Sequence, residues 1–394
     1  MDLLANLAMG FGAATAPSVL MYCFAGCVLG MIASALPRVG PVAIIAMLLP
    51  VTYAVPPVSA LVMLAGAYCG ARFGSFFAGC VGVAVVAVIA PPLTELAFRF
   101  GPAEYFSLAI FGLACAVVFS SGSVIKSIAM GVLGLLLGAV GADPNSGVTR
   151  YSFDVPELNG GIGFVSLAMG MFAIGQTIAN LSLPDEPRVA VNAATPAGWR
   201  RGGARFWPFI PMLALGIPLN AAMALVIGAM TIHRIQPGPQ VMTSHPQVFW
   251  GVVVSLWIVV VMLAVLTLLL GGIRARLPAI PIRWLFPVIV LLCAIGIYSI
   301  RGSTFDVGMV AAFGFIGYLF IKLGCQPAPL LLGFVLGPAM EENLRSALSL
   351  AQGEWSVLLT RPISASLLGA AAALLAVVAL PSIRAKRSET FVGD

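Results

Sequence analysis

Two segments that combine proline and glycine within apolar surroundings are the residues best suited to bind a solute. The first is LPRVGP at 36–41, which contains Pro37, Arg38, Gly40 and Pro41. Proline and glycine interrupt a helix and leave backbone N–H and C=O groups without intrahelical partners. At membrane depth such backbone is tolerated only where protein or a water-filled cavity satisfies it, and a helix N-terminus exposed in this way attracts anions. The segment therefore predicts a broken helix that is able to hold an anion.

The second segment is GIPLNA at 216–221, in the middle of another apolar stretch. Pro218 removes a backbone donor and Gly216 permits a bend, while Leu219 and Asn220 follow directly. The amide of Asn220 offers both donors and acceptors to a substrate or an ion. A kinked helix or a tight connection without any ligand would explain the composition of both segments equally well.

An internal repeat places two charged residues, Lys126 and Asp306, at equivalent positions. The Phe-to-Gly spacing is 16 residues in both copies (106 to 122 and 286 to 302), and the copies are offset by 180 residues. An ionisable residue inside a membrane indicates function by default. Each of these two lies close to a predicted interface, however, where Lys reaches toward water and Asp stabilises a helix N-terminus. We therefore expect structural roles, with charged support of a binding site as the alternative.

Signals for catalysis or metal binding are weak. Ser123 and Lys126 fit S-x-x-K, but the partner motifs are absent, so an intramembrane enzyme is only a minor alternative. His233 and His245 lie in a polar, proline-rich loop without metal-ligand spacing, and there is no HExxH, GxSxG or P-loop. The seven cysteines form no CxxC pair. We expect neither an enzyme nor a metal site.

The elements that must position these residues are apolar helices. Of the 394 residues 60% are hydrophobic and 9% are charged, whereas soluble domains carry about 25% charged residues. A helical span needs about 20 apolar residues. Stretches near this length are 16–36, 75–97, 103–120, 123–142, 161–182, 248–272, 284–300, 304–323 and 361–381, with shorter or interrupted ones at 41–54, 57–71, 206–232 and 327–339. The prediction is an all-α polytopic membrane protein of about ten to twelve transmembrane helices, with re-entrant or broken segments.

Loop charges predict the topology. Basic residues cluster at 200–205, at 274–283 and in the tail, which the positive-inside rule places in the cytoplasm, and the acidic loop 143–160 is then external. The net charge of +6 is therefore a topology signal and gives no indication of nucleic acid binding. The two copies of the repeat then run in opposite directions, as in coupled secondary transporters. We divide the chain into a first transmembrane repeat 1–182, a cytoplasmic linker 183–205, a second transmembrane repeat 206–381 and a cytoplasmic tail 382–394.

Local patterns predict how some helices pack. The pieces 41–54 and 57–71, split by Pro56 and Pro57, are too short to cross and predict a re-entrant hairpin. The glycine pairs 26/30, 66/70, 70/74 and 134/138 have the GxxxG spacing that allows close helix packing. In GPAMEENLRSAL at 337–348, the pattern predicts a helix that begins at Pro338 and carries an ion pair between Glu341 and Arg345.

Seven long segments of the chain match the sequence pattern of one family. They are LPRVGPVAIIAMLLP (36–50), SALVMLAGAYCGARFG (59–74), APPLTELAFRFGPAEYF (90–106), GIPLNAAMALVIGAMTIHRIQPGP (216–239), GIYSIRGSTFDV (296–307), KLGCQPAPLLLGFVLGPAMEENLRSAL (322–348) and TRPISA (360–365). Over nearly its whole length the chain thus resembles the large membrane subunit of the tripartite tricarboxylate transporters, the TctA family. The resemblance implies a permease subunit of a binding-protein-dependent secondary transporter, which imports tricarboxylates or related carboxylates with Na⁺ or H⁺ across the bacterial inner membrane. It also implies a small TctB-like membrane subunit and a periplasmic TctC-like solute-binding protein as partners, beside membrane lipid, and no cofactor other than Na⁺ as a coupling ion.

Two blocks of the family pattern are missing from this chain. After Gly74 there is no polar Gly-Ser-Thr stretch with its Ile-Pro-Gly-Glu loop, and before Trp207 there is no Leu-Pro-Gly-Gly-Gly loop with the Pro-Glu-Ala-Asn-Asn-like stretch. Arg38 stands where the family usually has Gly, and Leu219 where it often has Ser. Each retained segment has thus lost its inverted counterpart. Either the chain is a degenerate, non-transporting paralogue or scaffold, or the retained halves close on each other into a smaller site in which Arg38 pairs with a carboxylate.

Overall fold

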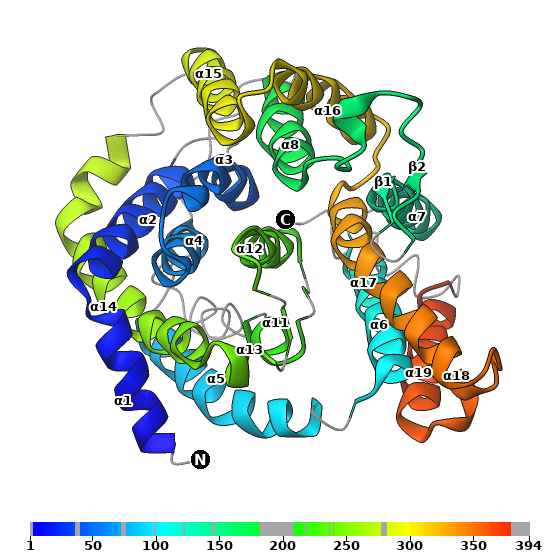
Figure 1. The fold of residues 1–394 in the computed structure, drawn as a ribbon. Helices are drawn as coiled ribbons and strands as arrows, with labels where there is room; N and C mark the ends of the chain where they lie inside the picture. The colour runs from blue at the N-terminus through cyan, green and yellow to red at the C-terminus, as the bar shows by residue number, and fades with distance from the viewer. Residues whose placement is uncertain are drawn as a thin grey trace. The chain divides into compact units, whose positions relative to one another are not determined.

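The computed structural model describes residues 3–35, 40–71, 76–97, 100–120, 123–143, 146–181, 209–216, 218, 220–235, 237–238, 240–276 and 282–379. It is 82% helical, which confirms the predicted all-α class (Figure 1). The helices are α1 Leu3–Ala14, α2 Pro17–Ala35, α3 Pro41–Tyr53, α4 Pro57–Ala71, α5 Phe76–Ala97, α6 Pro102–Phe119, α7 Val124–Gly138, α8 Phe164–Ala168, α9 Gln176–Leu181, α11 Phe209–Leu215, α12 Ala221–Ile232, α13 Val241–Ser244, α14 Pro246–Arg276, α15 Ile282–Arg301, α16 Thr304–Lys322, α17 Ala328–Leu350, α18 Val357–Thr360 and α19 Pro362–Ala379. A 3₁₀ turn η1 (Pro156–Leu158), a π-helix η2 (Met169–Gly175) and a two-stranded hairpin of β1 (Gly141–Ala142) and β2 (Thr149–Arg150) complete the described elements.

Proline marks where many of these helices start. It is the first residue of α2, α3, α4, α6, α14 and α19. At this position the missing N–H would have had no intrahelical partner, and the fixed φ of proline already suits the helix. The prolines that break the apolar sequence into short pieces therefore also begin the pieces.

Three helical stretches of the described residues are long and apolar enough to cross a membrane alone: Phe164–Leu181, Pro246–Leu269 and Thr304–Lys322. The helices α1 and α2 would form a fourth span together, but they are bent by 73° at the break between them. Eight shorter apolar helices of 10–17 residues accompany these. The sequence did not predict α1, which at 12 residues is too short to stand out as a span. A polytopic protein is supported, and the total of ten to twelve spans stays a prediction.

The described residues form two compact units. The first takes its residues from 1–97, 165–216 and 225–319, and the second from 98–164, 217–224 and 320–394. Each unit draws segments from both halves of the sequence. The units therefore do not correspond to the predicted repeats 1–182 and 206–381, whose inverted symmetry stays a prediction.

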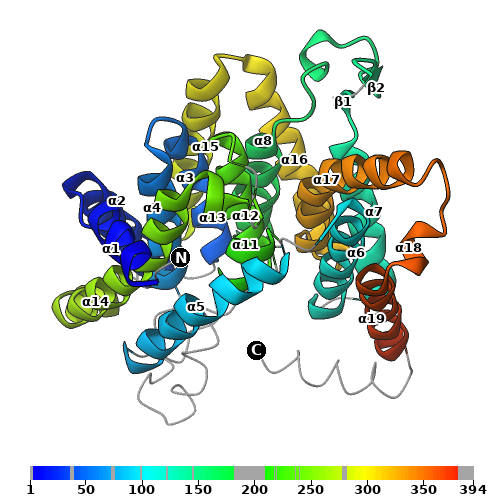
Figure 2. The same cartoon turned by 60° about the horizontal axis from the view of Figure 1, so that its bottom comes forward.

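In the first unit α2 packs along α4 at the glycines that the sequence singled out (Figures 1 and 2). A Cβ atom on Gly26 would lie 2.1 Å from the carbonyl oxygen of Met63, and one on Gly30 would lie 2.3 Å from that of Ala67. From the other side, a Cβ on Gly70 would lie 2.7 Å from the carbonyl oxygen of Cys27. Because only glycine permits this approach of two backbones, the GxxxG prediction is confirmed for these pairs. Gly74 lies outside the described residues.

The pieces 41–54 and 57–71 form two consecutive helices, α3 and α4, joined by a turn at residues 54–56. Their 13 and 15 residues give lengths of about 20 and 22 Å, shorter than the roughly 30 Å core of a bilayer. Every residue of α4 from Ser59 to Gly70 is buried. A helix that is apolar and buried on all sides belongs to the interior of its unit, as expected for one arm of a re-entrant hairpin.

Between α8 and α9 the chain forms a π-helix, η2, in which each N–H reaches back five residues instead of four. Its glycines pack against α16: a Cβ on Gly170 would lie 2.6 Å from the Cβ of Phe313, and one on Gly175 would lie 3.1 Å from the carbonyl oxygen of Gly314. All seven residues of η2 are buried. The π-helix is therefore fixed in place by close backbone packing.

In the second unit α17 packs against α6 and α7. A Cβ on Gly134 would lie 2.0 Å from the carbonyl oxygen of Leu330, and one on Gly138 would lie 2.8 Å from that of Phe334, which confirms this GxxxG pair as well.

The predicted helix start at Pro338 is wrong, because α17 runs without interruption from Ala328 to Leu350. Proline inside a helix cannot donate to the carbonyl four residues earlier, and here that carbonyl belongs to Phe334. The Phe334 oxygen lies against Gly138 of α7, so the helix packing occupies the group that proline leaves free.

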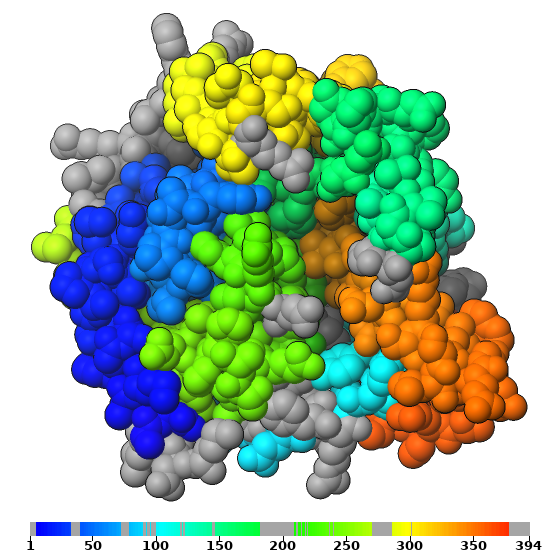
Figure 3. All heavy atoms as spheres, in the orientation of Figure 1, coloured from blue at the N-terminus to red at the C-terminus, as the bar shows by residue number. Residues whose placement is uncertain are grey.

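The loop predicted to be external, 143–160, contains β2, which pairs with β1 just before the loop: Gly141 pairs with Arg150 and Ala142 with Thr149. Just beyond β2, Tyr151, Phe153 and Asp154 have φ between 50° and 58°. These are left-handed conformations that non-glycine residues seldom adopt. Residues of this segment lie on the molecular surface (Figure 3), where Phe153 is 82% exposed.

Candidate functional site

The first predicted segment is described only at its end. Residues 36–39, with Pro37 and Arg38, lie outside the described residues. Gly40 has extended backbone (φ −76°, ψ 159°) and directly precedes Pro41, the first residue of α3, so a helix does begin where the sequence predicted. A Cβ on Gly40 would lie 3.5 Å from Nε2 of Gln176. The N-terminus of α3 thus faces a side-chain amide that the sequence analysis missed.

Gln176 owes its place to the π-helix. It is the first residue after η2 and begins α9. π-Helical segments occur often at functional sites because they redirect the side chains that follow them. A lone glutamine in an apolar span is a weak sequence signal, and nothing in its neighbours indicates a π-helix.

The second predicted segment does interrupt a helix. α11 ends at Leu215 and α12 begins at Ala221, with Gly216 between them at φ +73°, a left-handed conformation that favours glycine. Pro218 is buried, and Ile217 and Leu219 lie outside the described residues. The predicted bend at GIPLNA is therefore confirmed as a complete break between two helices.

Asn220 caps the second of these helices. Its Oδ1 accepts a hydrogen bond from the backbone N–H of Met223 at 2.9 Å, the geometry expected of an N-cap. One of the two lone-pair regions of Oδ1 is thus engaged in holding the start of α12. The predicted polar residue of the break therefore has at least a structural role.

After α12 the chain turns back toward the break. Arg234 has φ +57°, and Pro237 lies against Gly216, where a Cβ would lie 2.7 Å from the Pro237 carbonyl carbon. Residues 233–240 are here called the return segment, and α12, which they follow, has 12 residues and a length of about 18 Å. Helix α12 and the return segment together form a hairpin whose turn holds His233.

His233 joins the ends of the two signature helices. It follows α12, and its ring forms a hydrogen bond with the backbone of Thr52 in the last turn of α3. Among the described residues, Nε2 of His233 is the buried side-chain nitrogen or oxygen atom that has no hydrogen-bond partner. Burial lowers the pKa of His233 below its ordinary value, and the Thr52 hydrogen bond opposes this effect. The sequence analysis had given this histidine no role, because its loop is polar and rich in proline.

The charged pair from the internal repeat occupies helix ends. Asp306 is 6% exposed in the first turn of α16, and the Ser166 hydroxyl donates to its Oδ1 at 3.5 Å. Lys126 donates from Nζ to the carbonyl oxygen of Leu323, just after the last residue of α16, at 2.6 Å. A negative group at a helix N-terminus and a positive group at a C-terminus both stabilise the helix dipole. This geometry favours the structural reading of both residues.

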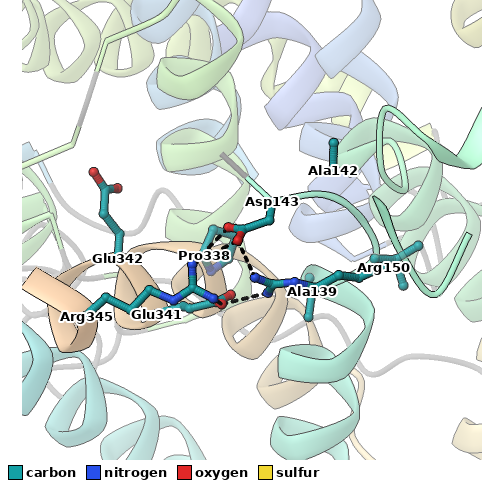
Figure 4. Close-up of a pocket in the computed structure, with 10 residues that line it drawn as sticks. Ala139, Ala142, Asp143, Arg150, Pro338, Glu341, Glu342 and Arg345 are labelled. Atoms are coloured by element: carbon teal, nitrogen blue, oxygen red, sulfur yellow. Dashed lines mark hydrogen bonds and ion pairs between the residues drawn. The ribbon is translucent and has the colours of Figure 1, made fainter. Parts of the chain in front are cut away.

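A cavity of about 170 Å³ lies in the second unit between α7, the β1–β2 hairpin and α17 (Figure 4). Four side chains form a closed ring at its wall. Asp143 accepts from Arg150 at 2.6 Å and from Arg345 at 2.9 Å, while Glu341 accepts from each of the same two arginines at 2.7 Å. The predicted pair of Glu341 and Arg345 is confirmed, and its two further partners were missed because they are about 200 residues away in sequence.

The ring fits a structural role better than a binding role. Asp143 has a side-chain exposure of 3%, and the Ser146 hydroxyl adds a further bond at 2.6 Å. Each guanidinium already faces two carboxylates, and hydrogen bonding to Glu341 raises the pKa of Arg150. Glu342 also lines the cavity but points away from the ring (Figure 4). Because each arginine is already paired with two carboxylates, we interpret the ring as a latch that fixes the hairpin to α17.

Comparison with known proteins gives one family. The model of the Tripartite tricarboxylate transporter TctA family matches residues 20–76, 71–201 and 202–332. The match is divided at 71–76 and at 201–202, close to the two places where the sequence predicts missing blocks.

Two relatives come from Agrobacterium vitis. The "Uncharacterized 52.8 kDa protein in TAR-I ttuC' 3'region" is 36% identical over 500 residues and covers 100% of both chains. The "Uncharacterized protein in TAR-II ttuC' 3'region" is 49% identical over 186 residues, which are 47% of this chain and 77% of the relative. Since the first alignment spans 500 residues and this chain has 394, that relative contains segments that this chain lacks. No solved structure matches the chain.

Proposed function

Because the chain belongs to the Tripartite tricarboxylate transporter TctA family, we propose that it is the membrane permease of a binding-protein-dependent secondary transporter. Family membership makes it a transmembrane transport subunit. In the proposed activity it imports tricarboxylates or related organic carboxylates across the bacterial inner membrane, with Na⁺ or H⁺ as the coupling ion. A periplasmic TctC-like protein delivers the substrate, and a small TctB-like membrane subunit completes the complex.

The observation that carries this proposal is the helix break at residues 216–220. A broken helix inside an apolar chain presents the positive end of a helix dipole and unpaired backbone groups to the interior. Secondary transporters use such half-helix N-termini to bind the carboxylates of their substrates. Here α12 begins directly after the break, and α3 begins in the same manner after the first signature segment.

Carboxylate binding is proposed for each of the two signature segments. Their backbone N–H groups and the Asn220 amide bind the carboxylates, and the Arg38 guanidinium forms a bidentate ion pair with one of them. The Gln176 amide, which faces Gly40, adds a neutral hydrogen-bonding group. The proposed substrate-binding residues are Pro37, Arg38, Gly40, Pro41, Gly216, Pro218, Leu219 and Asn220.

Uptake in proteoliposomes tests the proposal. The chain and its small subunit are reconstituted into vesicles that contain no citrate. Labelled citrate and the binding protein are then added outside, under a Na⁺ gradient, a pH gradient or no gradient. Gradient-dependent accumulation is expected, and the Arg38→Gln variant is expected to lose affinity for citrate while Arg38→Lys recovers only part of it. If no citrate accumulates under any gradient, although the partners are present and the protein is folded, the proposal is refuted.

A second candidate function is a non-transporting scaffold subunit. It is favoured by the segments that the 52.8 kDa relative has and this chain lacks. A scaffold would co-purify with the small subunit and the binding protein but would not move citrate. Insertion of the relative's two blocks after Gly74 and before Trp207 would then restore uptake.

We propose no enzymatic activity for this chain. The family is one of transporters, and the Lys126 amine of the S-x-x-K match is bonded to the carbonyl of Leu323. An unchanged phenotype of Ser123→Ala is the expected result.

A further inference from the structure

The hydrogen bond between His233 and Thr52 is a direct contact between the C-terminal ends of α12 and α3, the helices that begin at the two signature segments. Thr52 lies in the last turn of α3, and His233 follows the last residue of α12. Both residues belong to the first unit. Thr52 is itself held, since its hydroxyl donates to the carbonyl of Leu49 at 2.6 Å and its side chain is fully buried.

The two nitrogens of the His233 ring have different surroundings. Because Nε2 has no partner, the bond to the Thr52 backbone is made by Nδ1. The Thr52 bond stabilises the protonated ring, so Nδ1–H is the donor and the Thr52 carbonyl is the acceptor. In the neutral ring this leaves the lone pair of Nε2 open, on a buried atom. A buried acceptor without a partner is costly, and it is retained where a ligand or a proton uses it.

The residues that surround the ring carry little charge. Helix α3, its turn to α4, and α12 contain no Lys, Arg, Asp or Glu. Burial is the largest effect on the His233 pKa, followed by the Thr52 bond. Helices α2, α4 and α15 and the π-helix η2 pack against α3, and η2 has no titratable residue. The titratable or charged groups on these elements and on the return segment, among the described side chains, fall into three classes: exposed (Tyr53, Arg234 and Tyr298), half-buried (Tyr22 and His233 itself) and buried (Cys23, Cys27, Tyr68, Cys69 and Cys293).

We propose that Nε2 of His233 takes up the proton that enters with each carboxylate substrate, so that transport by this chain is coupled to H⁺. This inference rests on the proposed function and selects its coupling ion. The proton comes from external water, forms the Nε2–H bond, and leaves to the cytoplasmic side, which restores the neutral ring. The described residues contain no cluster of three potential metal-ligating side chains, so the histidine is better suited to a proton than to a metal ion.

The return segment connects the proton site to the helix break. Pro237 is the fourth residue after His233, and its carbonyl carbon lies 2.7 Å from the Cβ position of Gly216. A protonated ring has a second N–H, which finds no acceptor in the present arrangement. The turn at His233 must therefore rearrange on protonation, and the rearrangement moves Pro237 against the break where the substrate is proposed to bind.

The experiment compares His233→Asn with the matched control His245→Gln, which alters the exposed histidine after α13. Asparagine can still donate to the Thr52 carbonyl but does not titrate. With one proton per substrate, a gradient of one pH unit supports about tenfold accumulation of citrate in the wild type and in the control. The expected result for His233→Asn is loss of this accumulation, while exchange of internal for external citrate continues.

Several outcomes would overturn the inference. One is accumulation by His233→Asn equal to that of the wild type under a pH gradient. Another is wild-type uptake that follows the Na⁺ gradient alone, which leaves the proposed function intact. If the variant fails to fold, proton uptake by the wild type on binding of citrate, read with a pH indicator, decides the matter: one proton per citrate supports the inference and none overturns it. Failure of all gradients, by contrast, overturns the proposed function itself.

Discussion

Replacement of Gly134 by alanine measures how closely α7 and α17 must approach. The new Cβ atom would lie 2.0 Å from the carbonyl oxygen of Leu330 and 2.9 Å from the backbone nitrogen of Phe334, whereas ordinary contacts begin near 3.4 Å. Both clashing atoms belong to the backbone of α17, so no side-chain rotation can relieve the overlap. The two helices must separate locally by more than 1 Å.

The magnitude follows from two opposing effects. Overpacking of this kind costs about 1–3 kcal/mol, and separation also weakens the dispersion contacts along the seam. Alanine gains about 1 kcal/mol over glycine in helix propensity. Gly369→Ala in α19 isolates the second effect, because nothing lies within 4 Å of its Cβ position. We expect Gly134→Ala to be less stable than Gly369→Ala by about 2–3 kcal/mol, which at roughly 2 °C per kcal/mol is about 4–6 °C in Tm.

The assay is thermal unfolding of both variants and the wild type in one detergent at one scan rate, since unfolding of a membrane protein is in general irreversible. The expected order of Tm is Gly369→Ala at or above the wild type, and Gly134→Ala below it. Equal Tm values for the two variants would refute the reasoning, because the helices would then tolerate a methyl group at the seam as readily as in open space.

Three further predictions concern the latch, the break and the histidine. In a double-mutant cycle of Asp143→Asn and Arg345→Gln, chemical denaturation is expected to give a coupling energy of about 1 kcal/mol. The value is modest because Asp143 is buried but Arg345 is 40% exposed. A coupling energy of zero would contradict the latch. Gly216→Ala combines strain in a left-handed backbone conformation with a clash against the backbone of Pro237, whereas Gly302→Ala, at φ +63°, adds about 1 kcal/mol of strain alone. Only Gly216→Ala is therefore expected to abolish citrate uptake. Equal uptake by the two variants would exclude a special role for the break. Because burial lowers the pKa of His233 in the folded state, the unfolded chain binds the proton first, and stability should fall as pH drops below about 6.5; His233→Asn should remove this slope in Tm measured from pH 5 to 8.

Most of the helices could be predicted because their physical cause is local. Apolar length identifies a helix, proline marks its start, and a Gly-x-x-x-Gly pair marks a backbone contact without naming the partner helix. Helix α1 was missed because 12 apolar residues are too few to indicate a span. The predicted start at Pro338 was wrong because the compensation for proline, the contact of the Phe334 carbonyl with Gly138, comes from another helix.

The candidate site was only partly predictable. Glycine and proline at 216–218 indicated the break, because backbone permissiveness is a property of the residues themselves. Nothing local indicated that His233 would bond to Thr52, or that Asp143 would complete the ring around Glu341, because these partners are brought together by tertiary packing. Polar residues in loops carry no local sign of the burial that gives them importance.

The π-helix η2 sets the angular position of everything that follows it. If its hydrogen bonds shortened by one residue to the α pattern, each later side chain would rotate by about 100° around the axis. Gln176, next in the chain, would then swing away from the start of α3. The close packing of Gly170 and Gly175 against α16 opposes that rotation and so keeps the helix in one register.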